Sequence, residues 1–243
     1  MFRLLVVLMS LLPFWLWGEE PDWTPYAKLL ERHLSSQSKN NVSLNMVAYG
    51  KVKEDPLFAK VLEMVANHPA DKLTTPAEKM AFYINAYNIM AIKVVVDNWP
   101  LQSIRDAGGF ITPVWKVKVG VVAGQEVHLD LIEHKILRPM GDPRIHMALV
   151  CASVSCPDLR AEPYTAARLS QQLDNQTTVF LNNTGKGLRL EGKEAQVSVI
   201  FEWFGQDFES QGGVDAFIQR YHPLPEKVEI HAGMPYDWSV NGQ

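Results

Sequence analysis

The sequence predicts an α+β fold, in which a helix-rich single domain packs on a small, mainly antiparallel sheet. Apolar residues at helical spacing dominate the first half of the chain, and short strand-like segments appear mainly in the second half. The chain has no Gly-rich phosphate-binding loop, and its strands do not alternate regularly with helices. Nothing in the pattern therefore indicates a parallel doubly wound sheet.

The first eighteen residues have the pattern of a secretory signal peptide. Arg3 precedes a short apolar run, and acidic residues begin at Glu19. The run is shorter than the ~20 residues that a membrane-spanning helix needs. We therefore expect residues 1–18 to be a signal peptide, residues 19–243 to form one domain, and the mature protein to be periplasmic or secreted without membrane insertion. The alternative is an uncleaved N-terminal anchor.

The helical segments share apolar positions three and four residues apart. They are expected at 21–33, 56–67, 78–98, 165–181 and 214–221. The longest begins after Thr75, an N-cap residue followed by Pro76, and ends before Pro100. A short helix or helical turn is expected at 131–137.

The strand segments are short and rich in β-branched residues. They are expected at 45–49, 114–122, 126–129, 144–150, 188–190, 197–200 and 227–230, with a turn at 123–125 that closes a hairpin. The segment 144–150 is a continuous apolar run that ends abruptly at Cys151. We expect it to be a buried central strand that presents a reactive group at its end.

Charge and cysteine usage narrow the class of function. The formal net charge is −4 at pH 7, and no cluster of Lys and Arg indicates a nucleic-acid partner. The chain has two cysteines, Cys151 and Cys156, and neither lies in the expected signal peptide. An oxidising compartment permits a disulfide between them, and two free thiols are the alternative. The spacing of these cysteines does not indicate a zinc site, and we expect no metal and no cofactor. Metal ligation by His134, His146 and Glu133 is the alternative, although no H-E-x-x-H spacing is present.

Cys151 is the strongest candidate for a reactive residue. The small residues that follow it leave room for a substrate and for free backbone N–H groups. A nucleophilic thiol needs a lowered pKa, which a nearby histidine commonly provides. His146 lies five residues earlier, so on a regular strand it faces the opposite side. His134 comes from another element, and we expect it to be the base; an inert buried thiol is the alternative.

Three further residue types are candidates for the site. Asn85 and Asn88 lie three apart on one face of an apolar helix, so their amides either satisfy buried backbone or reach the histidine or the substrate. Arg144 either binds a substrate carboxylate or forms an ion pair. Cys156 could start a helical turn, which would lower the pKa of its thiol.

Several stretches resemble the signature blocks of the family called domain of unknown function 547. These stretches are 82–88 (FYINAYN), 132–138 (IEHKILR), 142–159 (DPRIHMALVCASVSCPDL), 201–208 (FEWFGQDF) and 236–239 (YDWS). The resemblance covers most of the expected mature chain in the right order. It implies a site centred on Cys151 and on the Glu133–His134 pair. Because the family lacks an assigned function, it implies no activity.

We therefore predict a thiol-dependent hydrolase or transferase of the cysteine-peptidase or transglutaminase-like type. Cys151 would attack an amide or thioester carbonyl of a small-molecule or peptide substrate, with His134 as general base and Glu133 among the residues that orient it. Backbone N–H groups after Cys151 would stabilise the oxyanion.

The residues expected to complete the substrate-binding site are Asn85, Asn88, His146, Cys156 and Arg144. The alternative function is a non-catalytic binding module for a small thiol or peptide, with a Cys151–Cys156 disulfide or a mixed disulfide. A structural envelope protein with a vestigial site is a third possibility.

Overall fold

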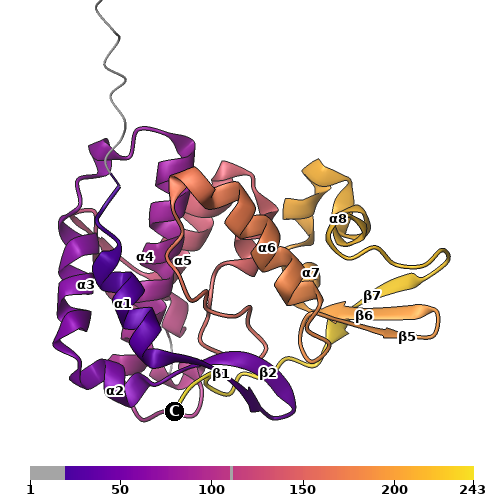
Figure 1. The fold of residues 1–243 in the computed structure, drawn as a ribbon, viewed down its shortest axis with the longest axis horizontal. Helices are drawn as coiled ribbons and strands as arrows, with labels where there is room; N and C mark the ends of the chain where they lie inside the picture. The colour runs from indigo at the N-terminus through magenta and orange to yellow at the C-terminus, as the bar shows by residue number, and fades with distance from the viewer. Residues whose placement is uncertain (1–19, 110–111) are drawn as a thin grey trace, which may run out of the picture.

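The computed structural model describes residues 20–109 and 112–243 and confirms the α+β class. Helices make up most of the body, and the described strands form three small sheets of two, two and three strands (Figure 1). Residues 1–18, the expected signal peptide, lie outside the described residues. None of the described helices combines the length and apolarity that crossing a bilayer demands.

Helix α4 (Pro76–Asp97) is the centre of the main hydrophobic core. Its first turn has a complete capping box: the Thr75 side chain accepts from the Glu78 amide, and the Glu78 carboxylate accepts from the Thr75 amide. Buried residues occur on almost every face of the helix. A helix that is apolar all round must be surrounded by protein, and α4 accordingly contacts α2 (Tyr49–Glu54), α3 (Pro56–Asn67) and α5 (Leu129–Leu131).

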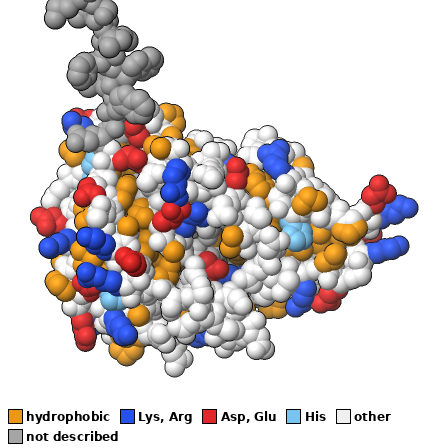
Figure 2. Space-filling view, in the orientation of Figure 1, with side chains coloured by type: hydrophobic (Ala, Val, Ile, Leu, Met, Phe, Trp, Pro, Cys, Tyr) orange, Lys and Arg blue, Asp and Glu red, His pale blue; other side chains and the backbone are white. Residues whose placement is uncertain are grey.

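The N-terminal part packs against one side of α4. Helix α1 (Thr24–His33) leads into strand β1 (Leu34–Lys39), which pairs antiparallel with β2 (Val42–Val47). The sequence did not predict β1, because its residues are mostly polar and exposed and give no strand pattern. Acidic and basic side chains are mixed over the region of α1, α2 and α3 on the face shown in Figure 2.

The expected hairpin in the middle of the chain is present but shorter. Strands β3 (Gly120–Val122) and β4 (Gln125–Val127) pair antiparallel. Ala123 and Gly124 connect them, and both have positive φ, as a two-residue type I′ hairpin turn requires. The beginning of the expected strand 114–122 is a 3₁₀ turn, Val114–Lys116.

The prediction of a central strand at 144–150 is wrong. Residues Pro143–Met147 form a 3₁₀ helix, and 148–150 continue as irregular, buried backbone. The local reason is a helix start signal: the Asp142 side chain accepts from the Arg144 amide, and Pro143 stands at the first helical position. The apolar run reflects burial alone, which a buried strand and a buried irregular segment share.

The amide of Asn88 takes the place that a neighbouring strand would have had. Its Nδ2 donates to the Ala148 carbonyl at 3.0 Å, and its Oδ1 accepts from the Val150 amide at 2.9 Å. Asn85, one turn earlier on α4, bonds in the same way to the carbonyl and the amide of Tyr164. Both asparagines therefore support buried backbone.

The C-terminal part forms a second, smaller core around Phe201, Phe208 and Phe217. The helices of this part are α6 (Leu169–Leu181), α7 (Ile200–Trp203) and α8 (Gly213–Tyr221). Its sheet has the order β5 (Leu188–Glu191), β6 (Glu194–Ser198) and β7 (Glu229–Met234), in which β6 pairs antiparallel with β5 and parallel with β7.

The last residues of the chain return to the main core. The Val154 amide donates to the Ser239 carbonyl at 2.9 Å, and the Asn241 amide donates to the Ala152 carbonyl at 3.0 Å. The Tyr49 hydroxyl donates to the Asn241 side chain at 2.7 Å. The C-terminal segment is thus held against the turn that contains both cysteines.

We expect Asn88→Ala to lower the free energy of unfolding by about 2–4 kcal/mol, because each buried backbone group left without a partner costs about 1–3 kcal/mol. Urea denaturation measures this change. Asn98→Ala is the matched control, since the exposed Asn98 amide donates only to the Val94 carbonyl at the helix end. Equal, small losses in both variants would contradict the role assigned to Asn88.

Candidate active site

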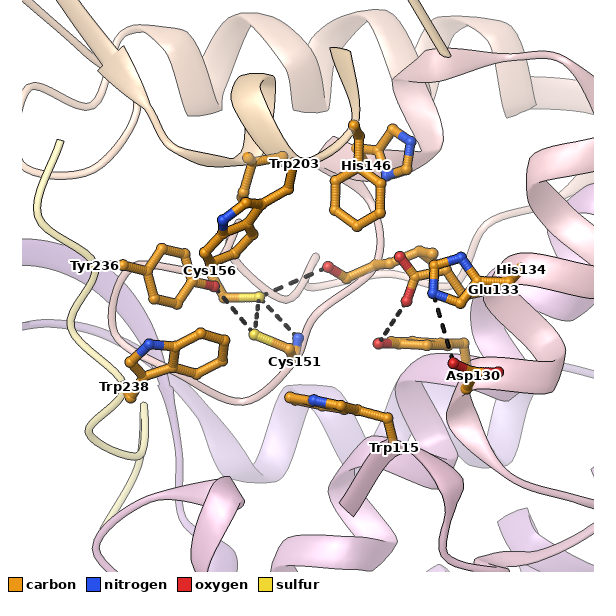
Figure 3. A pocket seen from close by; sticks show the side chains of 14 residues that line it. Trp115, Asp130, Glu133, His134, His146, Cys151, Cys156, Trp203, Tyr236 and Trp238 are labelled. Atoms are coloured by element: carbon orange, nitrogen blue, oxygen red, sulfur yellow. Dashed lines mark hydrogen bonds and ion pairs between the residues drawn. The ribbon is translucent and has the colours of Figure 1, made fainter. Parts of the chain in front are cut away.

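One pocket brings together the two thiols, an acidic helical segment and a group of aromatic rings, which come from distant parts of the chain (Figure 3). Its free volume is about 180 Å³. The residues that line it are Tyr87, Trp115, Asp130, Glu133, His134, His146, Leu149, Cys151, Cys156, Ile200, Trp203, Phe204, Tyr236 and Trp238. The pocket lies between the main core and the C-terminal core, because its walls come from both.

A tight turn holds the two sulfur atoms together. Ala152 has φ +59°, a left-handed conformation that is unusual for a non-glycine residue. The turn closes with a bond from the Cys156 amide to the Ser153 carbonyl, and it places the sulfurs of Cys151 and Cys156 at 2.8 Å. Both cysteines are free thiols; Cys151 is partly exposed to the pocket and Cys156 is buried.

Three polar groups form hydrogen bonds with the Cys151 sulfur. Besides the Cys156 thiol, the Ser153 hydroxyl lies at 3.1 Å and the Tyr236 hydroxyl at 3.2 Å. Burial alone would raise the pKa of Cys151, but these hydrogen bonds outweigh it and hold the pKa below its ordinary value. Burial and the charge of Cys151 raise the pKa of Cys156 well above its ordinary value. Cys151 is therefore the thiol that ionises first.

Glu133 faces the same pocket from the π-helix Ile132–Leu137. Burial and the charge of Cys151 raise the pKa of Glu133 to about 7. The Tyr87 hydroxyl donates to its carboxylate at 3.3 Å and offsets only part of this rise. A carboxyl group with this pKa can both give and take a proton near neutral pH.

His134 is held by an arginine on the same helical segment. The Arg138 guanidinium donates to His134 Nδ1 at 2.9 Å, and a guanidinium cannot accept a hydrogen bond. The neutral imidazole therefore carries its proton on Nε2, which lies 3.8 Å from the Asp130 carboxylate. Burial lowers the pKa of His134. Arg138 in turn donates twice to Asp207, at 2.7 and 2.8 Å.

His146 occupies the wall of the pocket with only 1% of its side chain exposed. Its Nε2 bonds to Asp207 at 2.8 Å, and its ring stacks on Phe204 at 4.0 Å between centroids. Burial lowers the pKa of His146 to about 4, so the ring is neutral at neutral pH. His146 and Cys151 line the same pocket and do not lie on opposite faces as expected, because residues 143–147 form a 3₁₀ helix and not a strand.

Five of the residues predicted for the site line this pocket: Glu133, His134, His146, Cys151 and Cys156. Among the described residues, neither histidine makes a hydrogen bond to the Cys151 sulfur; its partners are those given above. Asn85 and Asn88 use their amides on backbone. Arg144 forms ion pairs with Asp142 and Asp174 outside the pocket lining.

The backbone donors predicted for an oxyanion are fewer than expected. The Val154 amide donates to the Ser239 carbonyl, and the Ser155 amide donates to the Asp237 carbonyl. The Cys156 amide is also engaged within its own turn. The backbone N–H of Ser153 is directed at the Cys151 sulfur, so the Ala152 amide remains as the candidate directly after the nucleophile.

The aromatic walls were not predicted as part of the site. Trp115 lies in the 3₁₀ turn Val114–Lys116, and Trp203 is the last residue of α7. Tyr236 and Trp238 lie in the C-terminal segment that returns to the main core. The blocks FEWFGQDF and YDWS carry three of these rings. The resemblance of these two blocks to family motifs was the only indication in the sequence that their rings belong to the site. The spacing of residues along the chain could not place the rings beside Cys151. Across residues 20–109 and 112–243, no group of three His, Cys, Asp or Glu side chains could hold a metal ion.

Fold and site together define an α+β protein with a paired-thiol pocket. A family model described as "Protein of unknown function, DUF547" matches residues 70–181, which include α4, the π-helix and both cysteines. This match confirms, over residues 70–181, the resemblance to the family that the sequence motifs predict. The matched segment does not contain Trp203, Tyr236 or Trp238. Searches of curated proteins and of solved structures each found no match.

The buried His146 should make stability depend on pH. Its folded pKa of about 4 lies below the unfolded value of about 6.5, so unfolding takes up a proton between these values and stability falls as pH decreases through this window. From pH 7 to pH 5 this contribution is about 2 kcal/mol. The raised pKa of Glu133 acts in the opposite direction, so wild type must be compared with a variant.

We expect His146→Gln, which keeps an N–H donor for Asp207 without titrating, to lose less stability than wild type between pH 7 and pH 5. Urea denaturation at both pH values gives the difference. His231→Gln is the control, because His231 is exposed. Parallel pH dependences in wild type and His146→Gln would contradict the assignment.

Proposed function

We propose that this protein is a thiol-dependent hydrolase or transferase that acts on an amide or thioester carbonyl, with Cys151 as nucleophile. The observation that carries the proposal is the environment of the Cys151 sulfur. Cys151 lines the pocket, and its sulfur forms hydrogen bonds with Cys156, Ser153 and Tyr236. Ser153 donates to the Tyr236 hydroxyl at 3.1 Å, which leaves the Tyr236 proton free for the sulfur. Tyr236 and Cys156 can therefore both donate to the sulfur, which favours the thiolate, the reactive form.

In the first step the Cys151 thiolate attacks the carbonyl carbon. A carbon–sulfur bond forms and the carbonyl electron pair moves to oxygen. The amide of Ala152 is the backbone donor proposed for this oxyanion, and His134 offers its Nε2–H from the pocket wall. His134 thus acts as a donor in the proposal, in place of the base expected from the sequence, because Arg138 occupies its Nδ1.

Glu133 is the proposed proton carrier. When the oxyanion collapses, the bond to the leaving amine or thiol breaks, and the leaving group takes a proton from the Glu133 carboxyl. A water molecule or an acceptor amine then attacks the thioester and gives a proton to the Glu133 carboxylate. The acyl group leaves and the Cys151 thiolate is regenerated. A pKa of about 7 suits both halves of this cycle. We place the reaction in the periplasm or outside the cell, as residues 1–18 predict.

A second candidate function rests on the 2.8 Å approach of the two sulfurs. A lowered-pKa thiol beside a buried second thiol is the arrangement of a nucleophilic and a resolving cysteine. In this alternative Cys151 attacks a disulfide of a small thiol or peptide, forms a mixed disulfide and releases one thiol. Cys156 then attacks Cys151, releases the second thiol and leaves a Cys151–Cys156 disulfide.

The proposal predicts selective alkylation of Cys151 by iodoacetamide, with a pH midpoint below that of an ordinary thiol. Tyr236→Phe removes one donor to the thiolate, so the midpoint should rise by about 1 pH unit and the rate at pH 7 should fall about fivefold. Mass spectrometry of labelled protein measures both. Tyr221→Phe is the control, because the Tyr221 hydroxyl donates to Asp174 elsewhere. Labelling of Cys151→Ala at the wild-type rate would refute Cys151 as the nucleophile.

The two candidate functions differ in what Cys156 does. With a small aromatic disulfide as probe, the dithiol alternative predicts that wild type releases two thiols per protein and that Cys156→Ala releases one and retains a mixed disulfide on Cys151. If Cys156 serves only as a donor to the thiolate, wild type also stops at one released thiol. Absorbance of the released thiol and the intact mass distinguish these results.

A further inference from the structure

The pocket combines aromatic rings and carboxylates without a balancing cation. The described residues that line it include Asp130 and Glu133 but no lysine and no arginine. Its two histidines, His134 and His146, have lowered pKa values because they are buried, so they add no full positive charge at neutral pH. Ionisation of Cys151 adds further negative charge. An anionic substrate group would therefore find no countercharge in the pocket lining.

Four rings enclose the side of the pocket that faces Cys151 (Figure 3). Trp203 and Trp238 stack at 5.8 Å between centroids with planes 23° apart. Tyr236 lies 4.5 Å from Trp238, and Trp115 lies 6.3 Å from Trp238. Trp203 is 47% exposed, which is unusual for a residue of this size that takes part in an aromatic cluster. These rings form the wall that a bound group would touch.

The protein itself provides a cation for one of these rings. The guanidinium of Arg105 lies 5.2 Å from the Trp238 ring centroid, within the range of a cation–π contact. Among the described residues, Trp115 and Trp203 carry no such cation. Arg138, the nearest guanidinium on the acidic side, is bound to Asp207 and His134 and stacks on Phe204. Trp115 and Trp203 are thus open to a cation that comes from a ligand.

We propose that the substrate of this pocket carries an ammonium group, which binds between the indoles of Trp115 and Trp203 and the carboxylates of Asp130 and Glu133. The inference deepens the proposed function, because it names the substrate class for the Cys151 pocket. The electron-rich face of an indole attracts a cation and the carboxylates add direct charge attraction, whereas a neutral group of the same shape gains only the apolar contact.

Choline and 3,3-dimethyl-1-butanol test this proposal, because they have the same shape and hydroxyl and differ in charge. Binding is measured by tryptophan fluorescence and calorimetry on the full-length Cys151→Ala protein, so that no thiol chemistry takes part. We expect choline to bind at least about tenfold more tightly than the neutral alcohol. Equal affinity for both, or binding of neither, overturns the proposal.

Three variants in the Cys151→Ala background locate the site. Trp203→Leu keeps apolar bulk but removes the ring, and Asp130→Asn keeps shape but removes the charge. Each should weaken choline binding about threefold to tenfold and leave the binding of the neutral alcohol nearly unchanged. Glu202→Gln is the control, because Glu202 neighbours Trp203 on α7, is exposed and does not line the pocket. Equal choline affinity in all three variants also overturns the proposal.

The result separates this inference from the proposed function. If choline binds as expected but Cys151 in the otherwise unchanged protein shows ordinary thiol reactivity, the pocket is a cation-binding site and the catalytic proposal fails. If Cys151 is reactive and choline binding shows no charge preference, the catalytic proposal stands and the substrate class assigned here is wrong.

Discussion

The paired hydrogen bonds from Asn88 to the backbone at Ala148 and Val150 are the constraint on which the site depends. The segment before Cys151 is buried and has no neighbouring strand, so its polar backbone groups need another partner. One amide side chain on α4 supplies both a donor and an acceptor. Because α4 is capped and buried on almost all sides, this anchor is rigid, and the position of Cys151 follows from it.

A second constraint keeps the acidic side of the pocket in place. Asp207 accepts from Arg138 and bonds to His146, and Arg138 reaches on to His134. Asp207 precedes Phe208 of the C-terminal core, whereas His134 and Arg138 adjoin Leu137 and Ile132, which pack in the main core. The charged network therefore joins the two parts at the pocket and sets the proton position on His134. Hydrogen bonds to a charged group, such as the Asp207 carboxylate, are also stronger than hydrogen bonds between neutral groups.

The C-terminal segment forms the side of the pocket that contains Tyr236 and Trp238. The C-terminal segment is hydrogen-bonded to the cysteine turn through Ser239 and Asn241. It places the Tyr236 hydroxyl beside the Cys151 sulfur and the Trp238 ring beside Trp203. The electrostatics of the thiol and the shape of the substrate pocket are thus coupled through one short segment. Tyr236 belongs to both: its hydroxyl bonds to the Cys151 sulfur, and its ring packs on Trp238.

The sequence by itself determined the class of fold, most helices and the family resemblance, because amphipathic periodicity, Thr75–Pro76 capping and motif blocks are local signals. It also selected Cys151, Glu133 and His134, which do share a pocket. Only the tertiary structure decided how they meet. The apolar run at 144–150 could not distinguish a strand from buried irregular backbone, since both need the same hydrophobicity. The aromatic wall and the tautomer of His134 depend on Tyr236, Trp238 and Arg138, whose positions are fixed by long-range packing that no local pattern records.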